Sequence, residues 1–143
     1  MRYRIRRMKD SDYDAVLALW RGIAGIGLDD DSDSKAGIVR YLKRNPGMSF
    51  IALDGRTVVG AVLSGHDGRR GYLHHLAVAE PHRRRGLGRE MVNRCLRALA
   101  SRRIPKCNIF LFRSNARGKA FWAHNGWKRR EDLCIVQRMT KEV

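Results

Sequence analysis

One stretch of the chain, YLHHLAVAEPHRRRGLGRE from Tyr72 to Glu90, carries most of the information about the fold. Its apolar first part predicts a β-strand over Tyr72–Val78, and the periodic residues behind it predict a helix that runs to about Arg103. Between them lies a basic loop, His82–Arg89, whose core fits the pattern R-x-x-G-x-G. Glycines let the backbone turn tightly near an anion, and the first N–H groups of a helix have no partner within it. The stretch therefore predicts a phosphate-binding loop at a helix N-terminus.

Four arginines in this loop add positive charge and forked donors that match phosphate oxygens: Arg83, Arg84, Arg85 and Arg89. The loop is not a Walker loop, because no Lys-Ser or Lys-Thr pair follows its last glycine. It departs from the dinucleotide-binding fingerprint as well, since that motif has three glycines and an acidic residue about 20 residues later. The loop alone thus predicts an anion site, and its context along the chain must identify the ligand.

That context is an ordered series of motifs along nearly the whole chain. Leu76-Ala77-Val78 and a Pro-containing turn precede the loop, and an amphipathic helix, a strand, Ser114-Asn115 and the cluster Phe121-Trp122-x-x-Asn125-Gly126-Trp127 follow it. The series resembles the GNAT superfamily of acyl-CoA-dependent N-acetyltransferases. The resemblance implies a mixed α/β fold, in which about four helices flank a central, mostly antiparallel sheet, and a single GNAT domain over residues 1–143.

Composition is that of an ordinary globular domain. A length of 143 residues allows a hydrophobic core without covalent cross-links. Apolar runs are shorter than the roughly 20 residues that span a membrane, and the basic N-terminus lacks the apolar core of a signal peptide. The cysteines Cys95, Cys107 and Cys134 are scattered without metal-site spacing. We therefore expect free thiols, no metal and a cytoplasmic location.

The chain is strongly basic, because 30 Lys and Arg residues outnumber 14 Asp and Glu residues, for a formal net charge of +16. Three interpretations stay open. The arginines form a solvated surface without a specific partner, or their field draws in the anionic phosphates of CoA, or nucleic acid or the ribosome is a polyanionic partner. The first two are favoured about equally over the third.

Periodicity and turn signals predict the other elements. The elements expected are an opening strand around Tyr3–Arg6, a helix capped by Asp10 or Ser11 that ends at Gly22, a helix over Ser34–Arg44, strands at Met48–Leu53 and Thr57–Ser64 joined by an Asp54-Gly55 turn, a strand at Cys107–Phe112, a helix over Asn115–Asn125 and a closing strand at Leu133–Met139.

The resemblance also implies how acetyl-CoA binds: its pyrophosphate lies on the basic loop and its pantetheine arm lies beside the preceding strand. The backbone partners of the arm are then Leu76, Ala77 and Val78, and the N–H of Val78 is a candidate to polarise the thioester oxygen. Asn115 matches the family asparagine near the cofactor, although capping of the following helix explains this residue equally well. The residues matched to the pyrophosphate are Arg83, Arg84, Arg85, Gly86, Leu87, Gly88 and Arg89.

Acetylation of an amine is helped by a base whose pKa lies near the working pH. Many family members place a glutamate on the cofactor strand or on the strand after the helix, and this chain has Tyr72 and Phe110 at the matching positions. His74 lies two residues after Tyr72, on the same strand face, so it is the expected base, directly or through water. A purely structural role for His74 stays open. Glu80 is the reserve candidate, and His75 is expected on the opposite face in a structural role.

Two further positions bear on the reaction. Trp122 stands where the family often has a tyrosine that protonates the leaving thiolate, and an indole N–H cannot deliver a proton. We expect Trp122 to pack beside the thioester, while filling of the core with Phe121 and Trp127 stays open. The segment between the first two helices, expected to border the acceptor site, holds the only dense acidic run, Asp29–Asp33. This run either attracts a cationic amine or caps the next helix as a solvated loop, and the second interpretation is favoured.

The sequence thus predicts an N-acetyltransferase that moves an acetyl group from acetyl-CoA to a primary amine of a small molecule or peptide. One alternative is a basic RNA- or ribosome-associated binding protein. Another is a CoA-binding sensor without catalysis, because the family glutamate and tyrosine are both missing. The identity of the acceptor, a nucleic-acid partner and a homodimer stay open, and no membrane partner is expected.

Overall fold

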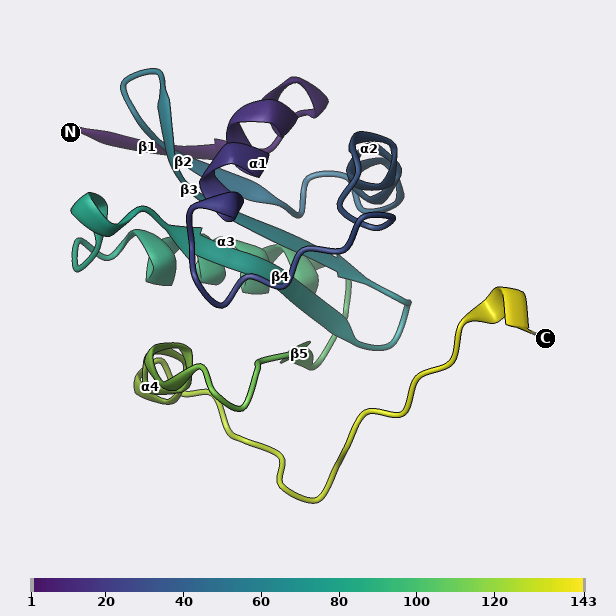
Figure 1. Ribbon diagram of the computed structural model, residues 1–143. Helices are drawn as coiled ribbons and strands as arrows, with labels where there is room; N and C mark the ends of the chain where they lie inside the picture. Colours follow the sequence, from purple (N-terminus) through teal and green to yellow (C-terminus); the bar gives the residue numbers. More distant parts are fainter. Residues whose placement is uncertain (1, 143) are drawn as a thin grey trace. The chain divides into compact units, whose positions relative to one another are not determined.

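The computed structural model describes residues 2–142 (Figure 1). The chain falls into two compact units, Met1–Phe110 and Leu111–Val143. The first unit holds the sheet, and the second holds one α-helix followed by extended chain. No helix in the described part of the chain is both long and apolar enough to cross a membrane. The single GNAT domain expected over residues 1–143 stays a prediction.

The sheet of the described residues contains five strands: β1 (Tyr3–Arg7), β2 (Phe50–Asp54), β3 (Thr57–His66), β4 (Gly71–Val78) and β5 (Cys107–Ile109). They follow one another across the sheet in chain order, antiparallel from β1 to β4, and β5 runs parallel to β4. The predicted turn between β2 and β3 is present, with Gly55 at φ +61°, a conformation that suits glycine. The mixed α/β class with a mostly antiparallel sheet is therefore confirmed.

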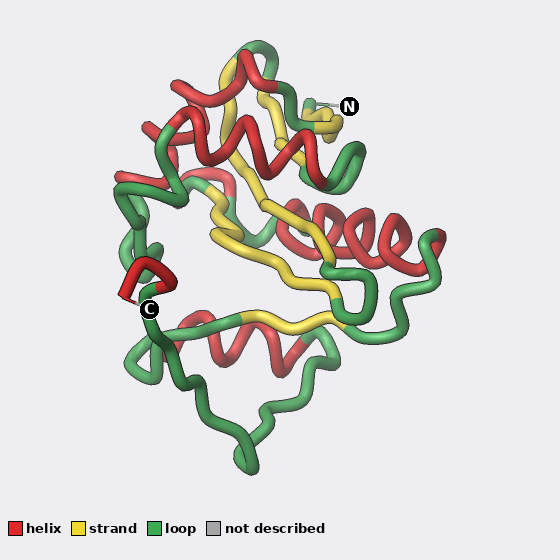
Figure 2. The backbone as a smooth tube through the Cα atoms, turned by 90° about the vertical axis from the view of Figure 1, so that its right-hand side faces the viewer, coloured by secondary structure: helices red, strands yellow, loops and turns green. Residues whose placement is uncertain are grey.

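The α-helices of the first unit cover both faces of the sheet: α1 (Tyr13–Arg21), α2 (Lys35–Arg44) and α3 (Leu87–Ser101). Figures 1 and 2 show α1 and α2 on one face and α3 on the other. The helix α3 also provides the crossover that the parallel pair β4–β5 requires. At the start of α2, the side chain of Ser34 accepts the N–H of Gly37 at 3.0 Å, as expected of an N-cap serine.

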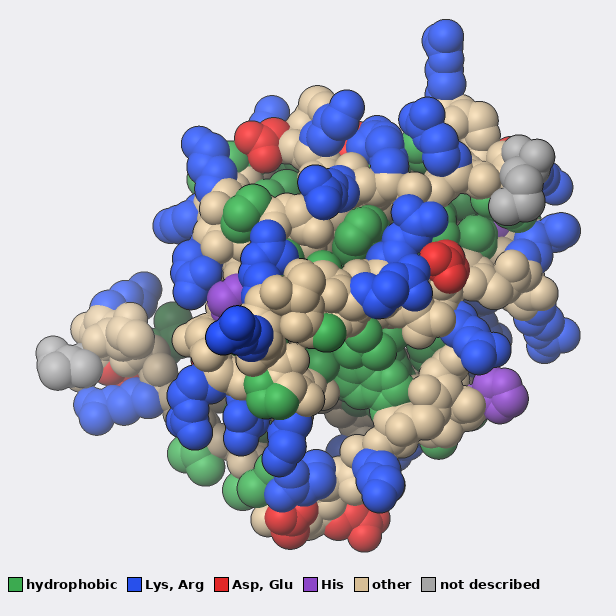
Figure 3. Space-filling model, turned by 180° about the vertical axis from the view of Figure 1, so that it is seen from behind, with side chains coloured by type: hydrophobic (Ala, Val, Ile, Leu, Met, Phe, Trp, Pro, Cys, Tyr) green, Lys and Arg blue, Asp and Glu red, His purple; other side chains and the backbone are tan. Residues whose placement is uncertain are grey.

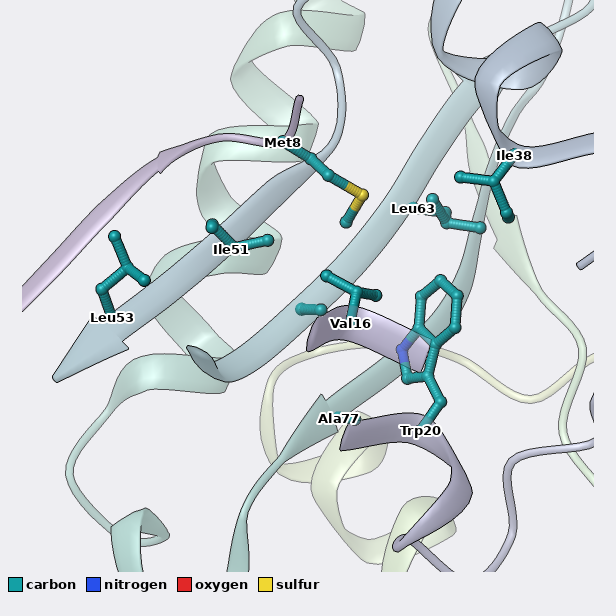
Figure 4. Close-up of a cluster of buried hydrophobic side chains, with 9 residues drawn as sticks. Met8, Val16, Trp20, Ile38, Ile51, Leu53, Leu63 and Ala77 are labelled. Carbon is teal, nitrogen blue, oxygen red and sulfur yellow. The ribbon is translucent and has the colours of Figure 1, made fainter. Parts of the chain in front are cut away.

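The core lies on both faces of the central strands, because their residues alternate between the helices on either side. Toward α3, the chain packs so closely that a Cβ at Gly60 would lie 2.9 Å from Met91 Cε. Toward α1 and α2, Trp20 is only 1% exposed, and full burial of such a large side chain contributes about 1.5–3 kcal/mol. This cluster, shown in Figure 4, contains Met8, Val16, Trp20, Ile38, Ile51, Leu53, Ala61, Leu63 and Ala77.

Two predicted strands are corrected. The strand predicted at Cys107–Phe112 ends at Ile109, because it pairs only with Gly71–Leu73 of β4. The segment Leu133–Met139, predicted to close the sheet, forms no strand, and the Val136 side chain is 89% exposed. An alternating sequence fits a strand only where a neighbouring strand supplies its hydrogen bonds and a packed face, which the sequence pattern does not show.

The first helix also begins later than predicted. A 3-10 turn, η1 (Asp10–Asp12), precedes α1, and Asp12 occupies its N-cap position in place of Asp10 or Ser11. The Asp12 carboxylate accepts the N–H of Lys9 at 2.7 Å and pairs with Arg6 at 2.8 Å. Because these bonds tie the turn to the end of β1, they move the helix start to Tyr13.

Candidate active site

The predicted phosphate loop lies between β4 and α3. After β4, the 3-10 turn η2 (Glu80–His82) redirects the chain, and Gly86 begins α3 with φ +79°, in the left-handed region that favours glycine. No described side chain caps this helix, so the N–H groups of Leu87, Gly88 and Arg89 lack a protein partner. A Cβ at Gly86 would meet no atom within 4 Å. The start of α3 is therefore open to a ligand.

Two contacts fix this loop against the sheet. Arg83 Nε donates to the carbonyl oxygen of Val78 at 2.8 Å, and the Tyr3 hydroxyl hydrogen-bonds to His82 Nδ1 at 2.8 Å. Arg84 has φ +63°, a conformation that non-glycine residues adopt rarely and that occurs preferentially at functional sites. The loop thus has a defined shape, while its remaining basic side chains are exposed: Arg84, Arg85 and Arg89.

The backbone of β4 is open on one side next to the loop. The strand β5 pairs with β4 only along Gly71–Leu73. On the other side, Ala79 N–H donates to Val59 O at 2.8 Å. Every second residue of an antiparallel strand bonds to the same neighbour, so Ala77, two residues earlier, is also bonded to β3. Val78 lies between them, and its N–H therefore points away from β3. Val78, one of the strand residues predicted to contact the pantetheine arm, therefore presents its backbone N–H to the open side of β4.

A β-bulge in β4 brings both histidines to one pocket. Two residues of β4, His75 and Leu76, oppose a single residue of β3, and His75 has φ +55°. The prediction that His75 points to the face opposite His74 is wrong, because the extra residue breaks the two-residue alternation of the strand. The two rings line the same pocket, with their centroids 6.4 Å apart.

This pocket has a volume of about 530 Å³ and is called the acceptor pocket from here on, because the sequence predicts that the segment before α2 borders the acceptor site. Close packing of α2 against the preceding segment shapes it, since a Cβ at Gly37 would lie 2.5 Å from Ser32 O. The lining residues come from the segment before α2 (Gly27, Asp29, Ser32, Asp33), from α2 (Gly37, Ile38, Arg40, Tyr41, Arg44), from β3 (Leu63) and from β4 (His74, His75).

Asp33 holds His75 in place within the acceptor pocket. The Asp33 side chain is buried, and its carboxylate oxygens lie 2.9 and 3.0 Å from His75 Nε2. The same carboxylate accepts the N–H of Asp29 at 2.8 Å, and the carbonyl oxygen of His75 accepts the indole N–H of Trp20 at 2.9 Å. The favoured interpretation of a solvated acidic loop does not hold for Asp33, because this side chain is buried and bonded to a histidine 42 residues away.

His74 lies in an aromatic environment beside this pair. Its ring stacks on Tyr72 at a centroid distance of 6.4 Å, as their two-residue spacing predicts, and the Tyr41 ring meets it edge-on at 6.0 Å. Burial lowers the pKa of His74, and the neighbouring His75 lowers it further, against an opposing effect of Asp33. The imidazole is therefore neutral near pH 7, which is the form that accepts a proton.

The other predicted residues are found in η2 and in the second unit. Glu80 is exposed in η2 and is not part of the pocket lining. In the second unit, Asn115 caps α4 (Ala116–His124) by accepting the N–H of Gly118 at 2.8 Å. Trp122, also in that unit, is 8% exposed and packs edge-on against Trp127 at a centroid distance of 4.7 Å. These contacts agree with the capping and core-filling interpretations of Asn115 and Trp122.

Sequence reasoning missed the contribution of α2 to the acceptor pocket. The only available signal was spacing, because residues three or four positions apart share one helical face. Nor did it find the bond between Asp33 and His75, which no local pattern indicates. Among the described residues, no group of three or more His, Cys, Asp or Glu side chains is placed to hold a metal ion. The missed pocket residues of α2 are Arg40, Tyr41 and Arg44.

Positive charge is spread widely over the surface. Figure 3 shows Lys and Arg side chains distributed across one whole face of the molecule, with few acidic side chains between them. Some arginines of the chain are paired within the protein, such as Arg94 and Arg97, which both contact Glu90 at 3.2 Å. This distribution fits the interpretation of a solvated basic surface.

Comparison with known proteins identifies the class. Residues 13–127 match the acetyltransferase (GNAT) family. An acetyltransferase of Yersinia pestis (strain Pestoides F) is 32% identical over 111 residues, which cover 78% of this chain and 77% of the relative. The chain therefore belongs to the GNAT acetyltransferase family, and it is an acyltransferase, as the sequence predicted.

Solved structures share the fold. The PaiA N-acetyltransferase from Thermoplasma acidophilum, in complex with coenzyme A, matches with a TM-score of 0.79 at 18% identity over 92% of each chain. An aminoglycoside acetyltransferase from an uncultured soil metagenomic sample, in complex with sisomicin, matches with a TM-score of 0.73 at 14% identity over 96% of each chain. The predicted GNAT fold is thereby confirmed.

Proposed function

We propose that this acyltransferase moves the acetyl group of acetyl-CoA to a primary amine of a small molecule or peptide. The observation that carries the proposal is the uncapped start of α3, where free N–H groups follow Gly86. A pyrophosphate fits this place, because N–H donors and the positive end of the helix dipole both favour an anion. The exposed side chains of Arg84, Arg85 and Arg89 add forked donors around it. The coenzyme A complex of the PaiA neighbour supports the assignment.

The pantetheine arm is proposed to follow β4 on the side where β5 has ended. Bound acetyl-CoA supplies the thioester whose carbonyl carbon the amine attacks. The N–H of Val78 points to this side, and there it would donate to the thioester oxygen and stabilise the negative charge that develops on it. Arg83 holds the end of the strand through its bond to the Val78 carbonyl oxygen. Leu76, in the bulge, borders the same stretch of backbone.

The amine is proposed to enter the acceptor pocket and to lose its proton to His74. A base must be neutral before it acts, and burial keeps His74 neutral near pH 7. Tyr72 supports the His74 ring by stacking, and Glu80 is less suited because it does not line the pocket. Trp122 is not the proton donor for the thiolate in this proposal, because an indole does not deliver a proton. Water would then protonate the leaving thiolate, and His74 would return the amine proton to the solvent, which restores the neutral base.

The test measures release of the free CoA thiol from acetyl-CoA in the presence of a panel of primary amines. We expect thiol release that depends on the amine, together with acetyl-CoA binding by calorimetry. Binding without transfer to any amine would refute the transferase proposal and favour the CoA-binding sensor. Absence of acetyl-CoA binding would instead refute the proposal that the loop binds this cofactor.

A cytoplasmic location is part of the same proposal. The cysteines Cys95, Cys107 and Cys134 are all free thiols in the structure, which suits a reducing compartment. Burial raises the pKa of Cys95 and of Cys107 to about 12, so these two thiols stay protonated and unreactive at neutral pH.

A further inference from the structure

Two arginines of the acceptor pocket have no role in the chemistry proposed above. Arg40 and Arg44 lie four residues apart on α2, so they project from the same helical face, and both line the pocket. The side-chain hydrogen bonds at the ends of this helix come instead from Ser34 and Asn45. Within the described chain, neither Arg40 nor Arg44 forms an ion pair with a carboxylate.

The acidic groups of the pocket are already engaged elsewhere. Asp33 binds His75 with both carboxylate oxygens. The Asp29 carboxylate accepts the N–H of Ser32 at 2.7 Å and the hydroxyl of the same residue at 2.6 Å. In the described chain neither carboxylate pairs with Arg40 or Arg44, so the exposed guanidinium groups of these two arginines are available to a ligand.

We propose that the acceptor carries a carboxylate besides its amine, as a free amino acid does, and that Arg40 and Arg44 bind this carboxylate. The inference rests on the proposed transfer to an amine at His74 in the same pocket. Side chains four residues apart on a helix have Cβ atoms about 5–6 Å apart, so two guanidinium forks can converge on one carboxylate. Charge-assisted bonds of this kind are among the strongest that a protein surface offers.

The rest of the pocket suits such a ligand. Ile38 and Leu63 form an apolar part of the lining, against which the carbon skeleton of an amino acid can pack.

The experiment compares each standard amino acid with its own carboxamide as acetyl acceptor, by kcat/KM. We expect the wild-type protein to prefer the acid of the best pair by roughly 10-fold or more, the size of one charge-assisted hydrogen bond. Arg40→Met and Arg44→Met should each lower this preference, and the double variant should bring it close to 1. Arg40→Lys, which keeps the charge and loses the fork, should fall between them. Lys43→Met is the matched control, because Lys43 is exposed on the same helix outside the pocket lining.

The possible failures are distinguishable. Because the α-amine of a carboxamide is less basic than that of the free acid, the decisive quantity is the change in the acid-to-amide ratio between proteins. A ratio that is the same in the wild-type protein and in the folded double variant would overturn the carboxylate proposal and leave transfer to an amine intact. If no amine accepts the acetyl group, calorimetry of N-acetylated amino acids against their amides, with CoA present, still decides the matter. Binding that is equal for acid and amide would refute the proposal without any turnover.

Discussion

Replacement of Gly86 by Asp is expected to weaken CoA binding well beyond the effect of Ala at the same position, while both variants lose similar stability. Gly86 stands at the start of α3 with φ +79°, and the space where a side chain would project is empty within 4 Å. A side chain at this position therefore meets the ligand and not the protein. Gly86→Ala is the matched control, because it imposes the same backbone conformation without adding charge.

The expected magnitudes follow from this geometry. An L-residue in the left-handed region costs about 1–2 kcal/mol, and this cost applies to the Ala and Asp variants alike. In the proposed complex the Asp carboxylate would also face the pyrophosphate, and two unit charges 4 Å apart interact by about 1 kcal/mol in water and about 4 kcal/mol at an effective dielectric constant of 20. For an exposed loop we expect about 2 kcal/mol of repulsion, which corresponds to a roughly 30-fold loss of affinity relative to Ala.

The assay combines calorimetric titration with CoA and urea denaturation of both variants. The two proteins should lose similar free energy of unfolding, while only Gly86→Asp loses most of its CoA affinity. The difference in affinity should narrow as salt is added, because about 0.1 M salt screens exposed charges over a distance of about 10 Å. Equal CoA affinities for the folded Ala and Asp variants would refute the placement of the pyrophosphate at this loop.

Three other outcomes test the site. His74→Ala should lower kcat with little change in CoA affinity. Burial lowers the pKa of His74 below 6.5 and a base acts when deprotonated, so the wild-type rate should rise with pH below pH 6.5, and the variant should lack this acid limb. A variant with an unchanged pH–rate profile would place the base elsewhere. Asp33→Asn should lower the free energy of unfolding by about 1–3 kcal/mol in urea denaturation, and the double variant with His75→Gln should lose less than the sum of the two single losses. A double variant that loses the full sum would show that the bond between Asp33 and His75 contributes nothing to stability. Trp122→Phe should retain turnover, and a collapse of kcat with intact CoA binding would show that the indole N–H takes part.

The cofactor half of the site was largely readable from the sequence. The strand before the loop, the glycine at the turn and the helix behind it lie next to one another in the chain, and each depends on local conformational preferences. The strand–loop–helix unit therefore appears where the sequence predicts it, as β4, the loop after it and α3. What the pattern did not show is that Arg83 turns back to the strand while its neighbours stay exposed.

The acceptor half depended on contacts between distant residues. The partner of His75 is Asp33, 42 residues earlier, and the residues that complete the pocket come from α2. The alternation rule failed at His75, because a bulge depends on the register between two strands and not on either strand alone. The segment Leu133–Met139 shows the same limit, since its alternating residues form no strand.

The sequence by itself determined the acetyltransferase class and the strand–loop–helix unit of β4 and α3, because these follow from short-range patterns that the chain carries in any context. Only the tertiary structure decided that both histidines line one pocket, that Asp33 is a buried partner of His75 and that, among the described residues, Arg40 and Arg44 form no ion pair. The physical reason is that strand register and side-chain pairing are set by packing between segments far apart in the chain, where several arrangements agree with the same local pattern.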